Sequence, residues 1–218
     1  MTSRERRAAR ELTDYLTRLF GPEATVTIDP MPARPQHPDR VEIEATVKRP
    51  HAAPPDTERK SRIPRDTPEN TALAVEIAER YVALRSARYA LPAGLVPTTC
   101  AIVSEGLERD YAALFPEGTL QVDVPWLELA RAAAETLAGH KVLDGVRSSQ
   151  VKSKFAELRW YTDGLPEGTG EEVSAILDAA SRFSTVVCET CGAPGSYRKG
   201  GWVRILCDPC STHRTRKL

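Results

Sequence analysis

The feature that most constrains this chain is a pair of cysteine couples near its end. The four cysteines follow the pattern C-x2-C-x15-C-x2-C, at Cys188, Cys191, Cys207 and Cys210. Two residues between cysteines let one tight turn direct both thiolates at a single ion, and this spacing is typical of a structural zinc site. We therefore predict one structural Zn²⁺ held by these four side chains.

The segment between the two couples predicts a β-hairpin, and with it a zinc ribbon. Lys199-Gly200-Gly201 has the composition of a turn, and strand-like alternation follows it. Gly192 can adopt the positive φ that turns backbone amides towards the sulfurs. A CxxC redox pair or an iron–sulfur cluster is the alternative. Because four thiolates leave zinc no open coordination position, we expect the metal to stabilise the fold and not to catalyse.

The overall charge excludes a protein that binds polyanions through its whole surface. The 218 residues include 30 basic and 30 acidic side chains, with a formal net charge of zero. Any contact with nucleic acid must then come from a local patch. No apolar run approaches the about 20 residues that span a bilayer. The N-terminus also lacks the apolar core of a secretory signal. We expect a cytoplasmic protein without membrane association, and no small-molecule substrate is evident.

The first half of the chain predicts two helices and a strand pair. Thr2 and Glu5 have the spacing of a capping box before an amphipathic helix that ends at Gly21-Pro22. ATVTID and VEIEATVK alternate like two strands of an antiparallel pair. The proline-rich, charged residues 48–67 predict a mobile loop before a second helix that begins at Pro68.

The second half predicts further short elements. The apolar residues Cys100–Val103 predict a short strand, and TLQVDV predicts another before a helix that begins at Pro125-Trp126. VKSKFAELRWYTDG predicts one partly buried strand, and EEVSAILDAASRF predicts a helix that leads into the cysteines.

These elements predict an α+β fold, with a small mixed sheet, helices and a C-terminal zinc ribbon. We expect three parts. Residues 1–118 form an α+β domain with the mobile loop, residues 119–185 an α/β segment, and residues 186–218 the ribbon with a basic tail.

The ribbon combines basic and aromatic side chains, which nucleic-acid backbone neutralisation and base stacking require. Trp202 either stacks on a base or packs over the metal knuckle, and both interpretations stay open. A thiolate cluster around zinc also offsets part of the positive charge. The candidate nucleic-acid-binding residues are Tyr197, Arg198, Lys199, Trp202, Arg204, Arg214, Arg216 and Lys217.

The second half resembles an uncharacterised family of small phage and bacterial zinc-ribbon proteins. Their usual pattern is "vKeKFGgLRfY" followed by "CE.CGapG" and "gW.rtLC", and the match covers about residues 120–211. This chain differs from the family at two positions where glycine is common: Ala156, and Pro125 directly before Trp126. The resemblance implies a zinc site and a phage or prophage origin, and it implies no activity.

The sequence contains no G-x-S-x-G, Walker, dinucleotide-loop, H-E-x-x-H or H-x-E motif. We therefore expect a non-enzymatic protein that binds nucleic acid as an accessory or regulatory factor. The alternative is a protein-binding modulator of a host complex in which the ribbon is only structural. A nuclease is a third reading, for which only His140 and His213 could supply the histidines.

Overall fold

The computed structural model describes residues 1–48, 68–90, 100–200 and 202–215. In this part of the chain six helices and three small sheets form, so the α+β prediction is confirmed. The predicted mobile loop lies outside the described residues apart from Lys48, which ends a strand.

The N-terminal helix α1 (Ser3–Phe20) forms as the sequence predicts. The Thr2 hydroxyl accepts a hydrogen bond from the Glu5 N–H, and the Glu5 carboxylate accepts one from the Thr2 N–H, which completes the capping box. Gly21 then ends the helix at a φ of 95°. One face of the helix is buried, through Ala8, Leu12, Tyr15, Leu16 and Phe20.

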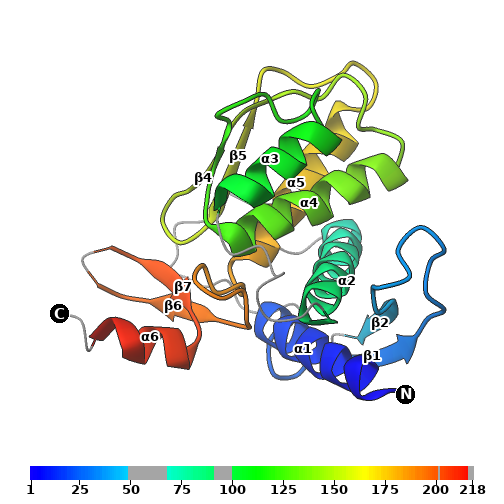
Figure 1. The fold of residues 1–218 in the computed structure, drawn as a ribbon, viewed down its shortest axis with the longest axis vertical. Helices are drawn as coiled ribbons and strands as arrows, with labels where there is room; N and C mark the ends of the chain where they lie inside the picture. The colour runs from blue at the N-terminus through cyan, green and yellow to red at the C-terminus, as the bar shows by residue number, and fades with distance from the viewer. Residues whose placement is uncertain (49–67, 91–99, 201, 216–218) are drawn as a thin grey trace.

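The predicted strand pair is also confirmed. The strands β1 (Thr25–Pro30) and β2 (Ile43–Lys48) are antiparallel, with Val26 opposite Val47. The pair packs against α1 and the second helix, on the side of α1 opposite the C-terminal hairpin (Figure 1).

Three helices form the centre of the molecule: α2 (Pro68–Ala90), α4 (Val124–Gly139) and α5 (Gly170–Ser184). Each of them packs against the other two, and α1 packs against α2 (Figure 1). Alanines on α4 let its neighbours approach closely, because their side chains end at Cβ. None of the described helices is long and apolar enough to cross a membrane.

The predicted strand at Cys100–Val103 is wrong, because these residues open the helix α3 (Cys100–Asp110). Val103 packs on the core and Leu107, four residues later, is buried, which is helical spacing. Ile102 and Cys100 are exposed. A short apolar run does not distinguish a strand from one turn of helix.

The segment predicted as one strand is a β-hairpin. The strands β4 (Ser148–Ser153) and β5 (Leu158–Thr162) are antiparallel, and β3 (Leu120–Gln121) pairs in parallel with β4. The turn is closed by a 2.9 Å hydrogen bond from the Lys154 N–H to the Glu157 carbonyl.

The C-terminal part contains the hairpin of β6 (Ser196–Arg198) and β7 (Arg204–Leu206), followed by α6 (Asp208–Thr215). The antiparallel pairing agrees with the predicted ribbon hairpin. One hydrophobic cluster nevertheless extends from Ala8 in α1 to Ile205 in β7. The ribbon therefore shares part of its apolar interior with the helices, while Leu206 packs with Cys188 and Cys207 in a separate small cluster.

Candidate metal centre and the surface beside it

The four cysteines of the two couples converge. Their Sγ atoms all lie within 4.8 Å of one another, and the Cys191 and Cys207 sulfurs are 3.5 Å apart. A tetrahedral ion with Zn–S bonds of about 2.3 Å would place its sulfurs about 3.8 Å apart. The donor set and its spacing therefore fit one four-coordinate metal ion.

Two different local structures position the two couples. The first couple lies between α5 and β6, where the Gly192 N–H donates to the Cys188 carbonyl at 2.8 Å. Gly192 has a φ of 74°, which confirms the expected left-handed turn. The second couple lies at the end of β7 and the start of α6, where the Ser211 N–H donates to the Cys207 carbonyl at 2.9 Å.

The thiols differ in proton affinity before any metal binds. A hydrogen bond with the Cys191 thiol lowers the pKa of Cys188 to about 4, and backbone N–H groups of Cys207, Cys191 and Thr190 add to this. The same contact with Cys188 raises the pKa of Cys191. Burial raises the pKa of Cys210 to about 11. One sulfur is thus prepared as a thiolate, and a bound cation would displace the remaining protons.

The first couple is held by a buried arginine from α2. Arg85, which is only 3% exposed, donates from Nη1 to the Cys191 carbonyl at 3.0 Å. Its other nitrogens contact the Glu11 carboxylate of α1, at 2.7 Å from Nη2 and 2.8 Å from Nε. The guanidinium is therefore neutralised within the protein while it fixes the backbone of a metal ligand.

Two tyrosines and a tryptophan bind the neighbouring backbone. The Gly192 carbonyl accepts hydrogen bonds from the Tyr15 hydroxyl and, at 3.4 Å, from the Tyr81 hydroxyl. The Trp126 indole N–H donates to the Val187 carbonyl at 3.2 Å. The sequence offered no signal for these contacts, because buried tyrosines and tryptophans on helices are usual core residues.

The structure pairs two of the predicted nucleic-acid-binding arginines with acids. Arg198 contacts the Asp208 carboxylate. Arg204 lies 3.2 Å from both Asp123 at the start of α4 and Glu189 in the first couple. These ion pairs reduce the positive charge that the ribbon can offer to phosphate.

The other predicted residues are placed less completely. Tyr197 lies on β6 and is 40% exposed, and Lys199 follows it in the turn. The backbone of Arg214 belongs to α6, and its side chain is not described. Arg216 and Lys217 lie outside the described residues.

Trp202 is largely exposed, which does not support the interpretation that it packs over the metal knuckle. Its side chain is 67% exposed, the largest exposed fraction among the large apolar side chains of the described residues. It lines a groove between the ribbon and the rest of the molecule.

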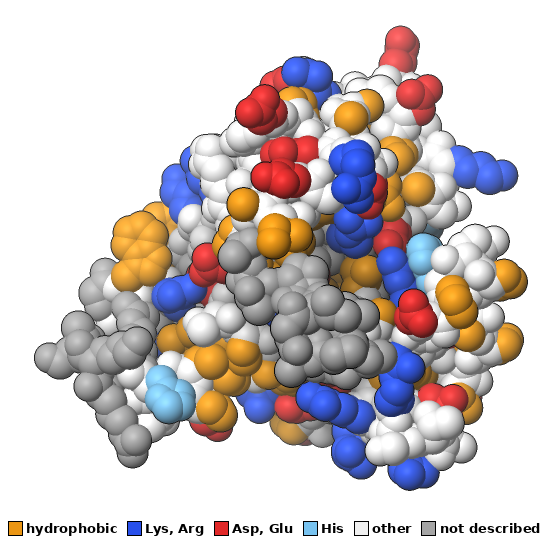
Figure 2. Space-filling view, in the orientation of Figure 1, with side chains coloured by type: hydrophobic (Ala, Val, Ile, Leu, Met, Phe, Trp, Pro, Cys, Tyr) orange, Lys and Arg blue, Asp and Glu red, His pale blue; other side chains and the backbone are white. Residues whose placement is uncertain are grey.

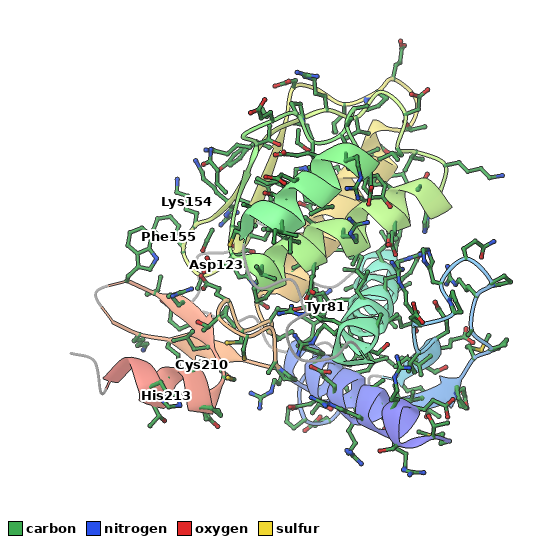
Figure 3. The ribbon with its side chains drawn as sticks, in the orientation of Figure 1. Tyr81, Asp123, Lys154, Phe155, Cys210 and His213 are labelled. Atoms are coloured by element: carbon green, nitrogen blue, oxygen red, sulfur yellow. The ribbon has the colours of Figure 1, made fainter. Side chains whose placement is uncertain are left out.

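That groove has a volume of about 520 Å³. The ribbon contributes Glu189, Trp202 and Arg204, and β4 contributes Ser153. The segment from β3 to the first turn of α4 contributes Leu120, Gln121, Val122, Asp123 and Trp126. Figure 3 shows Asp123 and Phe155 beside the β6–β7 hairpin.

Phe155 is a candidate functional residue that the sequence prediction missed. It occupies the tip of the β4–β5 hairpin, is 65% exposed and has a φ of 56°. A positive φ is uncommon for a bulky residue and costs of order 1–3 kcal/mol. The Lys154 ammonium lies 5.6 Å from the centre of the Phe155 ring. Predicting one continuous strand hid this turn.

The two histidines considered for a nuclease lie apart from the groove. His140 follows α4 and lies between carboxylates of Glu76 and Glu172, whereas Asp123 precedes the same helix. A helix of 16 residues is about 24 Å long, so His140 is distant from the groove. His213 is exposed on α6 (Figure 3).

No family model, curated protein or solved structure matches this chain. The resemblance to the phage and bacterial family thus stays a prediction.

Proposed function

We propose that this chain is a non-enzymatic protein that binds single-stranded nucleic acid beside a ribbon stabilised by one Zn²⁺. The four converging cysteines support a structural metal, and the choice of zinc follows from their all-thiolate chemistry. Reduced cysteines of this kind suit the cytoplasm. The accessory role and the phage or prophage origin belong to the same proposal.

The exposed aromatic rings carry the proposal for nucleic acid. Trp202 and Phe155 are 67% and 65% exposed, and Tyr161 and Tyr197 are 43% and 40% exposed. Figure 2 shows apolar side chains grouped at the edge where the β4–β5 hairpin approaches the ribbon. Unpaired bases stack on such rings without regard to sequence.

Lysines beside these rings supply the charge that phosphates need. Lys154 lies over the Phe155 ring, and Lys152 lies 5.4 Å from the centre of the Tyr161 ring. Both lysines are on the β4–β5 hairpin, so stacking and charge neutralisation come from one element. A chain with zero net charge has little long-range attraction for any polyanion, so binding must rely on stacking, which requires unpaired bases.

A binding measurement with short fluorescent DNA and RNA single strands tests this proposal. Replacing Trp202 or Phe155 by alanine should weaken binding by about 1–3 kcal/mol while the fold stays intact. Met31→Ala is the matched control, since Met31 is 47% exposed and follows β1 on the other side of the molecule. Affinity should also fall as salt rises. Wild-type protein that binds no single strand at low salt would refute the proposal.

A protein partner is the alternative, and the paired arginines favour it. Because Arg198 and Arg204 already contact carboxylates, the ribbon resembles a nearly neutral aromatic surface, which is common at protein interfaces. Pull-down from lysate with and without nuclease distinguishes a nucleic-acid partner from a protein partner. Nuclease-sensitive recovery of nucleic acid supports our proposal, and a protein retained after nuclease and high salt supports a modulator of a host complex.

A further inference from the structure

The groove beside the metal centre has the size and construction of a ligand site. Its volume of about 520 Å³ lies within the range of about 300–1,000 Å³ that small-molecule sites occupy. Both the ribbon and the β3–α4 connection line it. It therefore exists only while the ribbon is docked.

One exposed aromatic ring lines the groove, and a second exposed ring follows a lining residue closely along the chain. Trp202 lines it from the ribbon, and Phe155 lies two residues beyond Ser153, which lines it from β4. Phe155 adopts a strained positive φ although its side chain is exposed. Its neighbour Ala156 has a φ of 60° and is fully buried. The two-residue turn requires a positive φ at both positions, and packing selects the buried alanine, whereas no packing in the described structure selects a large exposed ring at Phe155.

The charged side chains of the groove, Glu189, Arg204 and Asp123, hold one another through hydrogen bonds. The Glu189 carboxylate accepts hydrogen bonds from the Ile205 N–H at 2.8 Å, from the Arg204 Nε at 3.2 Å and from the Ser153 hydroxyl at 3.3 Å. Both of its oxygens are used within the protein. Glu189 thus orients Arg204 and is itself occupied.

Asp123 is the acidic group of the groove that is available to a ligand. It stands at the N-cap position of α4, and its side chain makes no capping hydrogen bond. One oxygen, Oδ2, accepts from Arg204 Nη2 at 3.2 Å, and the side chain is 61% exposed. The groove consequently presents a carboxylate acceptor next to a guanidinium donor.

We propose that this groove binds one unpaired guanine base of a single strand, an inference that rests on the proposed function. The base would stack on Trp202, with Phe155 beside it. Guanine is the only common base with two adjacent donors, N1–H and the N2 amino group, on its Watson–Crick edge, and a carboxylate accepts both. The O6 acceptor of guanine lies next to these two donors on the same edge. Arg204, whose guanidinium contacts Asp123, would donate to this oxygen.

Competition between strands that differ at one base tests the inference on the wild-type protein. The probes are thymidine decamers with guanine, inosine, adenine or cytosine at one central position. The guanine strand should bind about 5- to 100-fold more tightly than the others, since a good bidentate pair discriminates to that degree. Inosine lacks only the N2 amino group, so it should lose much of this preference.

The substitution Asp123→Asn tests the residue. An amide offers one acceptor and adds a donor, so the preference for guanine should fall at least several-fold while binding of plain thymidine strands continues. Asp144→Asn, at an exposed acid on the connection between α4 and β4, is the matched control. Metal content and circular dichroism check that both variants remain folded.

The outcomes separate the inference from the function on which it rests. Salt-dependent binding that is equal for all four probes would overturn the guanine site and leave the proposed function standing. A guanine preference that is unchanged in Asp123→Asn would show that Asp123 does not recognise the base. Failure of every strand to bind would overturn both proposals and leave a protein partner as the occupant of the aromatic surface.

Discussion

At the scale of single residues, Gly192 shows how closely the metal centre is fitted to the helices. An added Cβ would meet Arg85 Nη1, Tyr81 Oη and Pro125 Cβ, in addition to the strain of a φ of 74°. The same position also presents the carbonyl that Tyr15 and Tyr81 bind. The backbone here is constrained by its neighbours as well as by its own conformation.

We predict that Gly192→Ala will destabilise the protein by about 3–5 kcal/mol, because steric displacement of buried groups adds to the cost of a left-handed alanine. Gly118→Ala is the control: Gly118 has a φ of 78°, and no atom lies within 4 Å of an added Cβ. It should cost only about 1–2 kcal/mol. Urea unfolding of both variants measures the difference. Equal losses would mean that the tight approach of Arg85 and Tyr81 contributes nothing.

The residue scale also shows what the sequence could establish about the site. The metal ligands are predictable because thiolates at CxxC spacing have few other uses, and the sequence therefore identified Cys188, Cys191, Cys207 and Cys210 together. Arg85 was not predictable, since a helical arginine gives no sign that it will be 3% exposed beneath a ligand carbonyl. Such partners depend on tertiary packing.

At the scale of elements, α1, α2, α4, α5 and the first strand pair follow local signals, whereas the start of α3 and the β4–β5 hairpin do not. Two-residue hairpin turns are recognised by glycine or asparagine, the residues that accept positive φ cheaply. Here Phe155 and Ala156 occupy those positions, with φ values of 56° and 60°. The turn therefore has no sequence signature, and one continuous strand was predicted. The resembled family commonly has glycine at the second position, which is the residue that this turn favours.

The end of α4 is joined to two other helices through one histidine. His140 Nδ1 lies 2.8 Å from Glu172 on α5, and Nε2 lies 3.0 Å from Glu76 on α2. A ring that contacts carboxylates through both nitrogens must carry two protons to donate to both. Arg80 also contacts Glu76, at 2.9 Å, so the cluster contains two cations and two anions when His140 is charged.

The hydrogen bonds to Glu76 and Glu172 raise the pKa of His140 above its ordinary value of 6.5. Partial burial opposes the charge on Glu76, yet hydrogen bonds from His140 and Arg80 lower its pKa. A raised histidine pKa means that the stabilisation is complete below pH 6.5 and is lost as the pH rises through the folded-state pKa.

We predict that His140→Gln will flatten this part of the stability profile, with a loss of up to about 1 kcal/mol below pH 6.5 that diminishes as the pH rises through the folded-state pKa of His140. His37→Gln, at an exposed histidine between β1 and β2, is the matched substitution for comparison. Urea unfolding across this pH range, with NMR titration of the ring, provides the measurement. A His140 pKa at or below 6.5 would contradict the proposed contacts.

At the scale of the whole molecule, the cysteine cluster is connected to residues far away in sequence. Val187, Cys191 and Gly192 present backbone carbonyls to side chains from α1, α2 and α4. The rings of Tyr15, Tyr81 and Phe183 pack edge to face beneath them, with centroids 5.2 to 5.9 Å apart. A polar and an aromatic layer therefore link the metal centre to the core.

These contacts determine which parts of the protein should lose structure when the metal is removed. If the ribbon were an independent folding unit, loss of the metal would unfold only the residues around the cysteines. Because Arg85 is buried with Glu11 and the Cys191 carbonyl as partners, displacement of the first couple would remove one hydrogen-bond acceptor from a buried guanidinium. Loss of a hydrogen-bond partner from a buried group costs about 1–3 kcal/mol.

We therefore predict that zinc removal will loosen α1 and α2 as well as the ribbon. The purified protein should contain about one zinc per chain, and Cys191→Ser should lower this sharply, because three thiolates hold the ion less well than four. In hydrogen exchange, the amides of α1 and α2 around Tyr15 and Tyr81 should lose protection in this variant or after chelation. The amides of α3, which contacts α4 away from the couple, serve as the internal control. Retention of full protection in α1 and α2 while the ribbon exchanges freely would show that the ribbon folds as a separate unit, and the division at residue 186 predicted from the sequence would then hold.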